Sequence, residues 1–123
     1  MENLIIQETY NSPIVSFNYQ TGILSLSGRA HPENADATFT PIIEWVEAYS
    51  ESPRLKTTLE INLEYFNSSA LKSILKLMAD LVSAKNKSEL KIIWHYYDDD
   101  SLEVAEDIEV LLEIKMDLIP EID

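Results

Sequence analysis

A change of hydrophobic period in the middle of the chain constrains the fold most. Between residues 55 and 65, apolar and polar side chains alternate, which predicts a strand with one buried side and one solvent-facing side. From Leu71 to Val82 the apolar residues instead recur every three or four positions, as in a helix with one apolar stripe. Residues 66–70, with the sequence Phe-Asn-Ser-Ser-Ala, join the two segments. The sequence therefore predicts a sheet strand that leads directly into a helix.

Asn67, Ser68 and Ser69 bring polar side chains to the expected start of that helix. Asn and Ser oxygens accept hydrogen bonds from first-turn N–H groups, so the plain interpretation is a helix N-cap. The same N–H groups, together with the positive end of the helix dipole, also favour a phosphoryl group. The positive charge of Lys72, one turn further on, interacts slightly unfavourably with the positive end of the helix dipole. It would interact favourably with a phosphate bound there. The pattern alone favours the cap and leaves a phosphate site as the alternative.

The N-terminal part of the chain predicts an antiparallel meander of three short strands. Residues 4–6 are apolar and open a first short strand, apolar and polar residues alternate at 15–19 and 24–27, and Gly22 can adopt the positive φ of a hairpin turn. Gly28 is expected to end the third strand. A helix should follow around residues 39–49, with Pro41 in its first turn, where a missing N–H costs nothing.

The C-terminal part continues the alternation of strands and helices. After the central unit we expect a strand over 90–96, a helix over 104–112 and a last strand over 114–118. The element order is then β-β-β-α-β-α-β-α-β, and strands that follow helices should be parallel through right-handed crossovers. Because the strands alternate, helices on both faces of the sheet are not expected. Residues 1–123 are therefore predicted to form a single α/β domain with two layers, a mixed sheet of about six strands and three helices on one face.

Composition narrows the classes of function. The chain has 123 residues and a net charge of −13, so it repels phosphate backbones and anionic lipids, and we expect neither nucleic acid nor a membrane as a partner. It has no cysteine, which excludes disulfides and thiolate chemistry and is compatible with a reducing cytosol. The first residues show no signal-peptide pattern, and no apolar run reaches the ~20 residues of a membrane span. A soluble cytoplasmic domain is expected.

Signatures of catalysis and of metal or cofactor binding are missing from the sequence. With two glycines in the chain, there is no Gly-rich phosphate loop, and His31 and His95 belong to no spaced ligand set. His95 is expected on the polar side of its strand, facing solvent. The Asp98-Asp99-Asp100 run lacks the Gly and distal Glu of a calcium loop, so we interpret it as loop and helix-cap chemistry. We expect no enzymatic activity, no metal and no cofactor.

Three stretches, in order along the chain, resemble the SiaC family of bacterial regulatory phosphoproteins, which has a STAS-like (anti-sigma-factor-antagonist-like) fold. The stretches are Gly28 with Pro32-Glu33-Asn34, then Tyr65-Phe66-Asn67-Ser68-Ser69-Ala70-Leu71-Lys72, then Trp94-His95-Tyr96-Tyr97-Asp98-Asp99-Asp100. The second stretch is also similar to the Asp-Ser-Ser/Thr-Gly-Leu phosphosite of STAS domains, with Asn67 in place of Asp and Ala70 in place of Gly. The resemblance covers nearly the whole chain.

The resemblance implies a switch protein with Ser68 at the position of the family's phosphoacceptor Thr. Ser69 is the alternative acceptor, and Asn67 and Lys72 are the neighbours of the site. The implied partners are a Ser/Thr protein kinase, a PPM-type phosphatase and an output protein, by resemblance a diguanylate cyclase. The expected partner surface comprises Tyr65, Pro32, Glu33, Asn34, Tyr96, Asp98 and Asp99. The alternative function is a STAS-like binding module for a protein or small ligand, without phosphorylation.

Overall fold

The computed structural model describes residues 1–121. Its elements are β1 (Leu4–Ile6), β2 (Ile14–Asn18), β3 (Ile23–Ala30), α1 (Ala35–Glu51), β4 (Lys56–Phe66), α2 (Ser68–Ser83), β5 (Glu89–Tyr96), α3 (Asp99–Leu112) and β6 (Asp117–Pro120). The six strands form one sheet in chain order, antiparallel from β1 to β3 and parallel from β3 to β6. The predicted element order and mixed sheet are confirmed.

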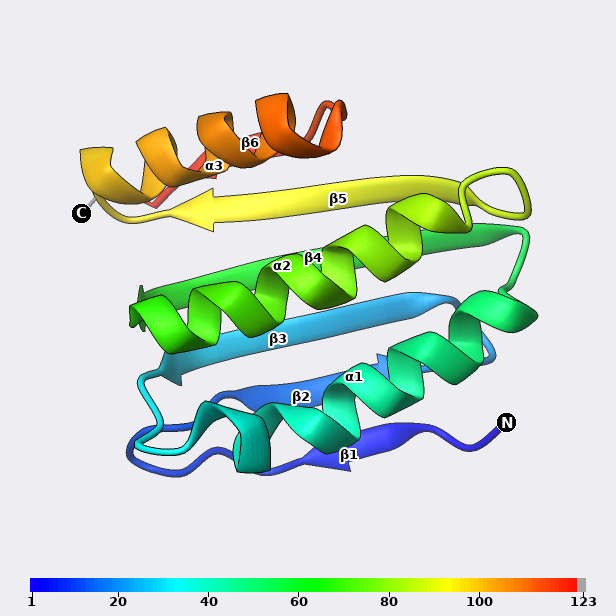
Figure 1. Cartoon of the computed structure of the whole chain (residues 1–123), viewed down its shortest axis with the longest axis horizontal. Helices are drawn as coiled ribbons and strands as arrows, with labels where there is room; N and C mark the ends of the chain where they lie inside the picture. The colour runs from blue at the N-terminus through cyan, green and yellow to red at the C-terminus, as the bar shows by residue number, and fades with distance from the viewer. Residues whose placement is uncertain (122–123) are drawn as a thin grey trace.

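All three helices lie on the same face of the sheet (Figure 1). This follows from the topology. Each new parallel strand is added beside the previous one in the same direction across the sheet, so each right-handed crossover places its helix on the same face. The alternation in β4 agrees, since Thr57, Leu59, Ile61 and Leu63 are buried beneath the helices. Thr58, Glu60 and Asn62 lie on the opposite face, which is free of helices in the described part of the chain, so the two-layer prediction is confirmed.

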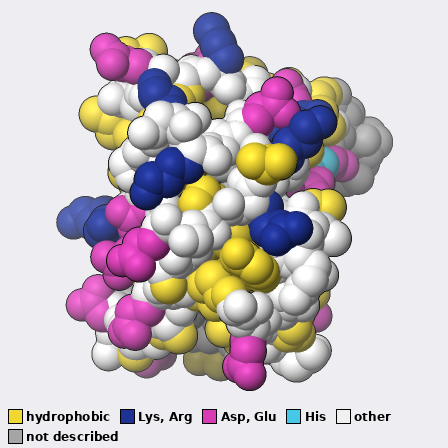
Figure 2. Space-filling model, turned by 90° about the vertical axis from the view of Figure 1, so that its right-hand side faces the viewer, with side chains coloured by type: hydrophobic (Ala, Val, Ile, Leu, Met, Phe, Trp, Pro, Cys, Tyr) yellow, Lys and Arg dark blue, Asp and Glu magenta, His cyan; other side chains and the backbone are white. Residues whose placement is uncertain are grey.

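The three helices also run in the same direction. Each begins at the edge where β3, β4 and β5 end, on the left of Figure 1. Helices α1 and α2 end near the edge where those strands begin, whereas α3 ends over the middle of β5. Figure 2 views the molecule from this second end, where Lys and Arg side chains are spread over the surface among Asp and Glu side chains. Because both ends of the sheet are built from helix–strand loops, they are the natural places for functional side chains.

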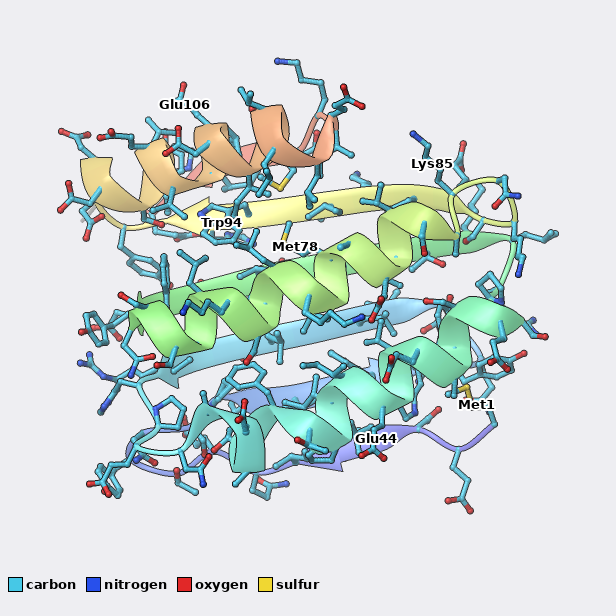
Figure 3. All side chains as sticks on the ribbon, viewed as in Figure 1. Met1, Glu44, Met78, Lys85, Trp94 and Glu106 are labelled. Atoms are coloured by element: carbon cyan, nitrogen blue, oxygen red, sulfur yellow. The ribbon has the colours of Figure 1, made fainter. Side chains whose placement is uncertain are left out.

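The core fills the layer between the sheet and the helices. Trp94 of β5 and Met78 of α2, both labelled in Figure 3, are fully buried there. Trp94 donates from Nε1 to Ser101 Oγ at the start of α3 (3.2 Å), which satisfies its polar atom inside the core. No helix within residues 1–121 has both the length and the hydropathy needed to cross a membrane.

Several boundaries differ from the predictions, among them the start of α3, which lies at Asp99 and not near residue 104. Gly28 does not end β3: its φ of 106° allows a bulge at Gly28/Arg29, and the strand continues to Ala30. Helix α1 begins earlier than predicted, because Asn34 caps it, so Pro41 lies inside the helix on an exposed position and not in the first turn. The last strand begins at Asp117, because Ile114 N–H donates to Glu109 O (3.0 Å) and completes the C-cap of α3.

Candidate functional site

The edge where the helices begin collects the predicted site residues. Each helix has an Asx N-cap here: Asn34, Asn67 and Asp98 accept from the N–H groups of Ala37 (3.1 Å), Ala70 (2.9 Å) and Ser101 (2.8 Å). The interpretation of the Asp98–Asp100 run as cap chemistry is confirmed at Asp98. Three positive helix ends therefore face the same edge of the molecule.

Ser68 is the first residue of α2 and is exposed. The cap oxygen of Asn67 takes the N–H of Ala70, and the first N–H bonded within the helix is that of Leu71, to Asn67 O (3.0 Å). Within residues 1–121, the N–H groups of Ser68 and Ser69 have no acceptor. Two backbone donors and an accessible hydroxyl are thus available together at the positive end of a sixteen-residue helix.

Asn67 fixes this junction to the neighbouring strand and loop. Its backbone N–H donates to Ala30 O at the end of β3 (2.9 Å), and its Nδ2 donates to Pro32 O (3.4 Å). An aspartate could form the cap but could not donate the second bond, because an ionised carboxylate has no hydrogen to give. The Asn in place of the usual Asp therefore has a structural function in this chain.

Ser69 has different surroundings from Ser68. It lines a pocket of about 230 Å³ between the starts of α1 and α2, together with Lys72 and Ser73 of its own helix. Glu33 and Asp36, at the start of α1, line the same pocket. The space next to Ser69 thus contains two carboxylates and one ammonium group, which is less favourable for an added anion than open solvent beside Ser68.

One extra residue in β4, where the register with β3 shifts, reorients the end of β4 next to Ser68. Gly28 pairs with Leu63 and Arg29 pairs with Tyr65, so one residue of β4 is left unopposed and the alternation reverses. Phe66 then turns into the core against Trp94 (5.7 Å between ring centroids), whereas Tyr65 lies on the helix-free face, 48% exposed. Tyr65 is the predicted partner residue that this geometry presents most clearly.

An aromatic cluster around Tyr65 was not predicted. The His31 ring lies between Tyr65 (5.6 Å) and Tyr10 (6.4 Å), and the Arg29 guanidinium lies over the Tyr65 ring (5.4 Å). Tyr97, after β5, is also exposed and donates to Asn62 Oδ1 (2.6 Å). These residues come from separate loops and strands, so they come together only when the chain folds and its strands pair.

The other predicted partner residues are not equally accessible. Glu33 and Asp99 are exposed, but Pro32 is buried and contributes its carbonyl to Asn67. Asn34 and Asp98 are exposed, and each uses its Oδ1 atom as a helix cap. Tyr96 is half-buried and packs against the core.

The prediction of a solvent-facing His95 was wrong. Its ring lies on the helix-free face between Glu60 of β4 (Nε2–Oε2, 2.7 Å) and Glu121 after β6 (Nδ1–Oε1, 2.6 Å), and its side chain is only 13% exposed. Burial lowers the pKa of His95, but the hydrogen bonds and charges of Glu60 and Glu121 together outweigh it and raise the pKa above its ordinary value. His95 therefore joins β4, β5 and the end of β6. Sequence reasoning missed the two carboxylates because their contact depends on strand order.

The described residues offer little for catalysis at this edge. No group of three or more Asp, Glu or His side chains within residues 1–121 is arranged to hold a metal ion. What the edge does provide is an exposed hydroxyl, unbonded N–H donors and a surface of mixed aromatic and acidic side chains. Such an arrangement suits covalent modification and protein binding.

Comparisons with known proteins agree with this geometry. Residues 6–121 match the model of the SiaC family regulatory phosphoproteins. An uncharacterized protein of Pseudomonas aeruginosa (strain UCBPP-PA14) is 31% identical over 97 residues, which cover 78% of this chain and 77% of that protein. The crystal structure of apo-SiaC from Pseudomonas aeruginosa superposes with a TM-score of 0.87 at 26% identity, covering 97% of this chain and 99% of that one.

A second solved structure shows SiaC in an assembly. In the complex of the diguanylate cyclase SiaD with its activator SiaC, also from Pseudomonas aeruginosa, the matching chain has a TM-score of 0.86 and 25% identity. The match covers 96% of this chain and 99% of that chain. The family model spans nearly all of the sequence, and the fold agrees from β1 to β6. The chain belongs to the SiaC family of regulatory phosphoproteins.

Proposed function

We propose that this chain is a non-catalytic cytoplasmic switch, reversibly phosphorylated on Ser68, that controls a diguanylate cyclase by binding it. A Ser/Thr protein kinase adds the phosphate and a PPM-type phosphatase removes it. The observation that carries the proposal is the position of Ser68: exposed, at the first position of α2, beside two N–H groups without an acceptor among the described residues.

The modified protein should keep its fold. A phosphate at Ser68 adds roughly −1.5 to −2 charges and three acceptor oxygens. The N–H groups of Ser68 and Ser69 and the dipole of α2 favour that charge, and Lys72 lies one turn away. The phosphate therefore changes the surface of the edge without disturbing the core beneath it.

Electrostatics favour Ser68 over Ser69 as the residue that receives the phosphate. A phosphate on Ser69 would enter the pocket that Glu33 and Asp36 line, and like charges there oppose it. The hydroxyl of Ser68 lies outside this pocket. We therefore assign the modification to Ser68 and expect Ser69 to be a poor substrate.

The output partner is proposed from the relative that binds a diguanylate cyclase as its activator. The edge around Ser68 is already acidic, with Glu33, Asp99 and Glu64 exposed, and it displays Tyr65 next to the acceptor. A partner that covers Tyr65 in the unmodified state would meet a bulky dianion after phosphorylation. Loss of binding then follows from steric exclusion and charge repulsion at one contact.

The test uses purified diguanylate cyclases of the organism that makes this chain and measures both binding and cyclic-di-GMP synthesis. Ser68→Ala should bind and activate like the unmodified wild type, and its stability should change by less than about 0.5 kcal/mol, since Asn67 and not Ser68 forms the cap. Ser68→Asp should bind about tenfold more weakly. Ser69→Ala is the matched control and should still lose cyclase binding after treatment with the kinase.

Two outcomes would contradict the proposal. If kinase-treated wild type and Ser68→Ala bind the cyclase equally well, the chain is a binding module that needs no phosphorylation. If neither form changes cyclase activity, the diguanylate cyclase is not its output.

A further inference from the structure

Helix α3 is the most acidic helix of the molecule. Its fourteen residues include six Asp or Glu side chains and no Lys or Arg. It lies at one end of the helix layer, beside α2, and no further helix covers its other side in the described part of the chain (Figure 1). Five exposed residues share the solvent-facing side of its later turns, and we define them as the outer face of α3: Glu103, Glu106, Asp107, Val110 and Leu111.

The fold explains some of the carboxylates of α3. Asp99 and Asp100 lie in its first turn, where negative side chains interact favourably with the helix dipole. Glu109 is half-buried, and its Oε2 accepts from the Met116 N–H (2.8 Å), so it fixes the loop that leads into β6. These three acidic residues therefore have structural functions within the chain.

The carboxylates of the outer face have no such function. Among residues 1–121, no ion pair includes Glu103, Glu106 or Asp107. Glu103 and Asp107 lie one turn apart, at i and i+4, where like charges destabilise a helix. Glu106 and Asp107 also lie in the half of the helix nearer the negative end of its dipole. The outer face thus holds unpaired like charges at a cost to the stability of its own helix, as expected of a surface used for recognition.

Two adjacent apolar side chains complete the outer face. Val110 is 80% exposed and Leu111 is 67% exposed, although both belong to an ordered last turn whose C-cap is completed by the bond from Ile114 N–H to Glu109 O (3.0 Å). The sheet and the other helices therefore leave this apolar pair in solvent. An exposed apolar pair surrounded by polar residues is typical of a protein-binding surface.

A hollow of about 560 Å³ lies next to Val110. Its lining residues are Glu106, Glu109, Val110, Glu113, Ile114 and Lys115. Three carboxylates against one ammonium group leave the hollow negative, and Val110 and Ile114 give it an apolar wall. A lysine or arginine side chain matches both features, because its stem packs on apolar groups while its charged head reaches a carboxylate.

We propose that the outer face of α3 binds a basic amphipathic helix of a partner protein. Apolar side chains of that helix cover Val110 and Leu111, its Lys and Arg side chains meet the carboxylates of the outer face, and one of them enters the hollow. Charge complementarity selects this occupant. Nucleic acid, an anionic lipid surface and a second copy of a chain with net charge −13 are all repelled by α3.

This surface is separate from the phosphorylation proposed at Ser68. Val110 lies roughly 16 Å along α3 from Asp99, at about 1.5 Å per residue, and Asp99 is at the edge that carries Ser68. Binding at the outer face requires neither a phosphate on Ser68 nor a diguanylate cyclase. The unmodified chain is therefore sufficient for the test, and failure of one proposal leaves the other standing.

The test is an NMR titration of the full chain with three synthetic peptides. The first repeats leucine and lysine at the spacing of an amphipathic helix, the second has glutamate in place of lysine, and the third has the composition of the first in scrambled order. The first peptide should shift amide resonances of residues 103–115, with an affinity that falls as sodium chloride is raised from about 50 to about 300 mM. The glutamate peptide should leave these resonances unchanged, and the scrambled peptide should bind about tenfold more weakly.

Matched variants separate charge from apolar contact. Glu106→Gln with Asp107→Asn should weaken binding of the first peptide about tenfold, whereas Glu44→Gln with Glu51→Gln, the same change of charge on α1, should leave it unchanged. Val110→Ser with Leu111→Ser keeps the charge and should weaken binding about fivefold. Leu55→Ser, at another exposed leucine, is the control and should bind as wild type.

Four results would overturn the proposal. The first is that the lysine peptide causes no shift at millimolar concentration, and the second is that it shifts residues 36–51 of α1 as strongly as those of α3. The third is that the variant with serine at positions 110 and 111 binds like the wild type. The fourth is that residues 103–115 shift with protein concentration in the absence of peptide, which would assign the surface to a second copy of the chain.

Discussion

The two ends of the helix layer differ in how their polar groups are used. Where the helices begin, Asn34, Asn67 and Asp98 are committed to capping, and Ser68 remains as an exposed hydroxyl with N–H donors beside it. Where the helices end, cations lie outside the last turns and Leu55 is exposed. The first end presents an exposed hydroxyl and N–H donors at the start of a helix, whereas the second presents cations, carboxylates and one exposed apolar side chain. Strand β4 runs from one end to the other, from Lys56 to Phe66, so both ends are built on the same sheet.

The largest effect on stability is expected at the second end. Gly22 has a φ of 71°, and a Cβ added there would lie 2.2 Å from Lys56 O, a backbone atom that cannot simply move aside. Gly22→Ala should therefore lower the free energy of unfolding by about 3 kcal/mol, measured by urea denaturation. Gln20→Ala, in the same turn, should change it by less than about 0.5 kcal/mol. Equal effects of the two variants would show that the turn is not tightly packed against β4.

An intermediate effect, dependent on pH, is expected at His95. The pKa of His95 is raised in the folded protein, so its contribution to stability is complete below the unfolded-state pKa of about 6.5 and is lost as pH rises through the folded-state pKa. The wild type should lose about 1–2 kcal/mol more than His95→Gln between pH 6 and pH 9, in parallel urea titrations. A His95→Gln protein with the same pH dependence as wild type would exclude the bridge to Glu60 and Glu121 as its source.

A smaller effect is expected at the cap beside Ser68. Asn67→Ala removes the acceptor of the Ala70 N–H and should cost about 1 kcal/mol in thermal or urea unfolding. Asn67→Asp keeps that acceptor and loses only the long bond to Pro32 O (3.4 Å), so its cost should be about half or less. Asn86→Ala, in the loop after α2, is the matched change at the other end and should be nearly neutral. If Asn86→Ala destabilises as much as Asn67→Ala, the two ends do not differ in capping as described.

The sequence predicted the elements because their information is local. The alternation of β4 and the helical stripe of α2 can be read from neighbouring residues, and the position of every helix on one face follows from crossover handedness. The cap at Asn67 and the start of α2 at Ser68 were predicted because they depend on one local junction. It was not predicted where it depends on pairing between strands: the bulge at Gly28/Arg29 decides the side on which Tyr65 lies, and the register of β5 and β6 brings Glu121 to His95.

Mapping of the phosphorylated residue tests the central claim most directly. The wild type, Ser68→Ala and Ser69→Ala should each be co-expressed with the cognate kinase and examined by intact mass and by sequencing of the phosphopeptide that spans residues 57–72. We predict one phosphate on Ser68 in the wild type and in Ser69→Ala, and none in Ser68→Ala. A phosphate on Ser69, Thr57 or Thr58 with Ser68 unmodified would contradict the assignment, and so would a Ser68→Ala protein that is phosphorylated as fully as the wild type.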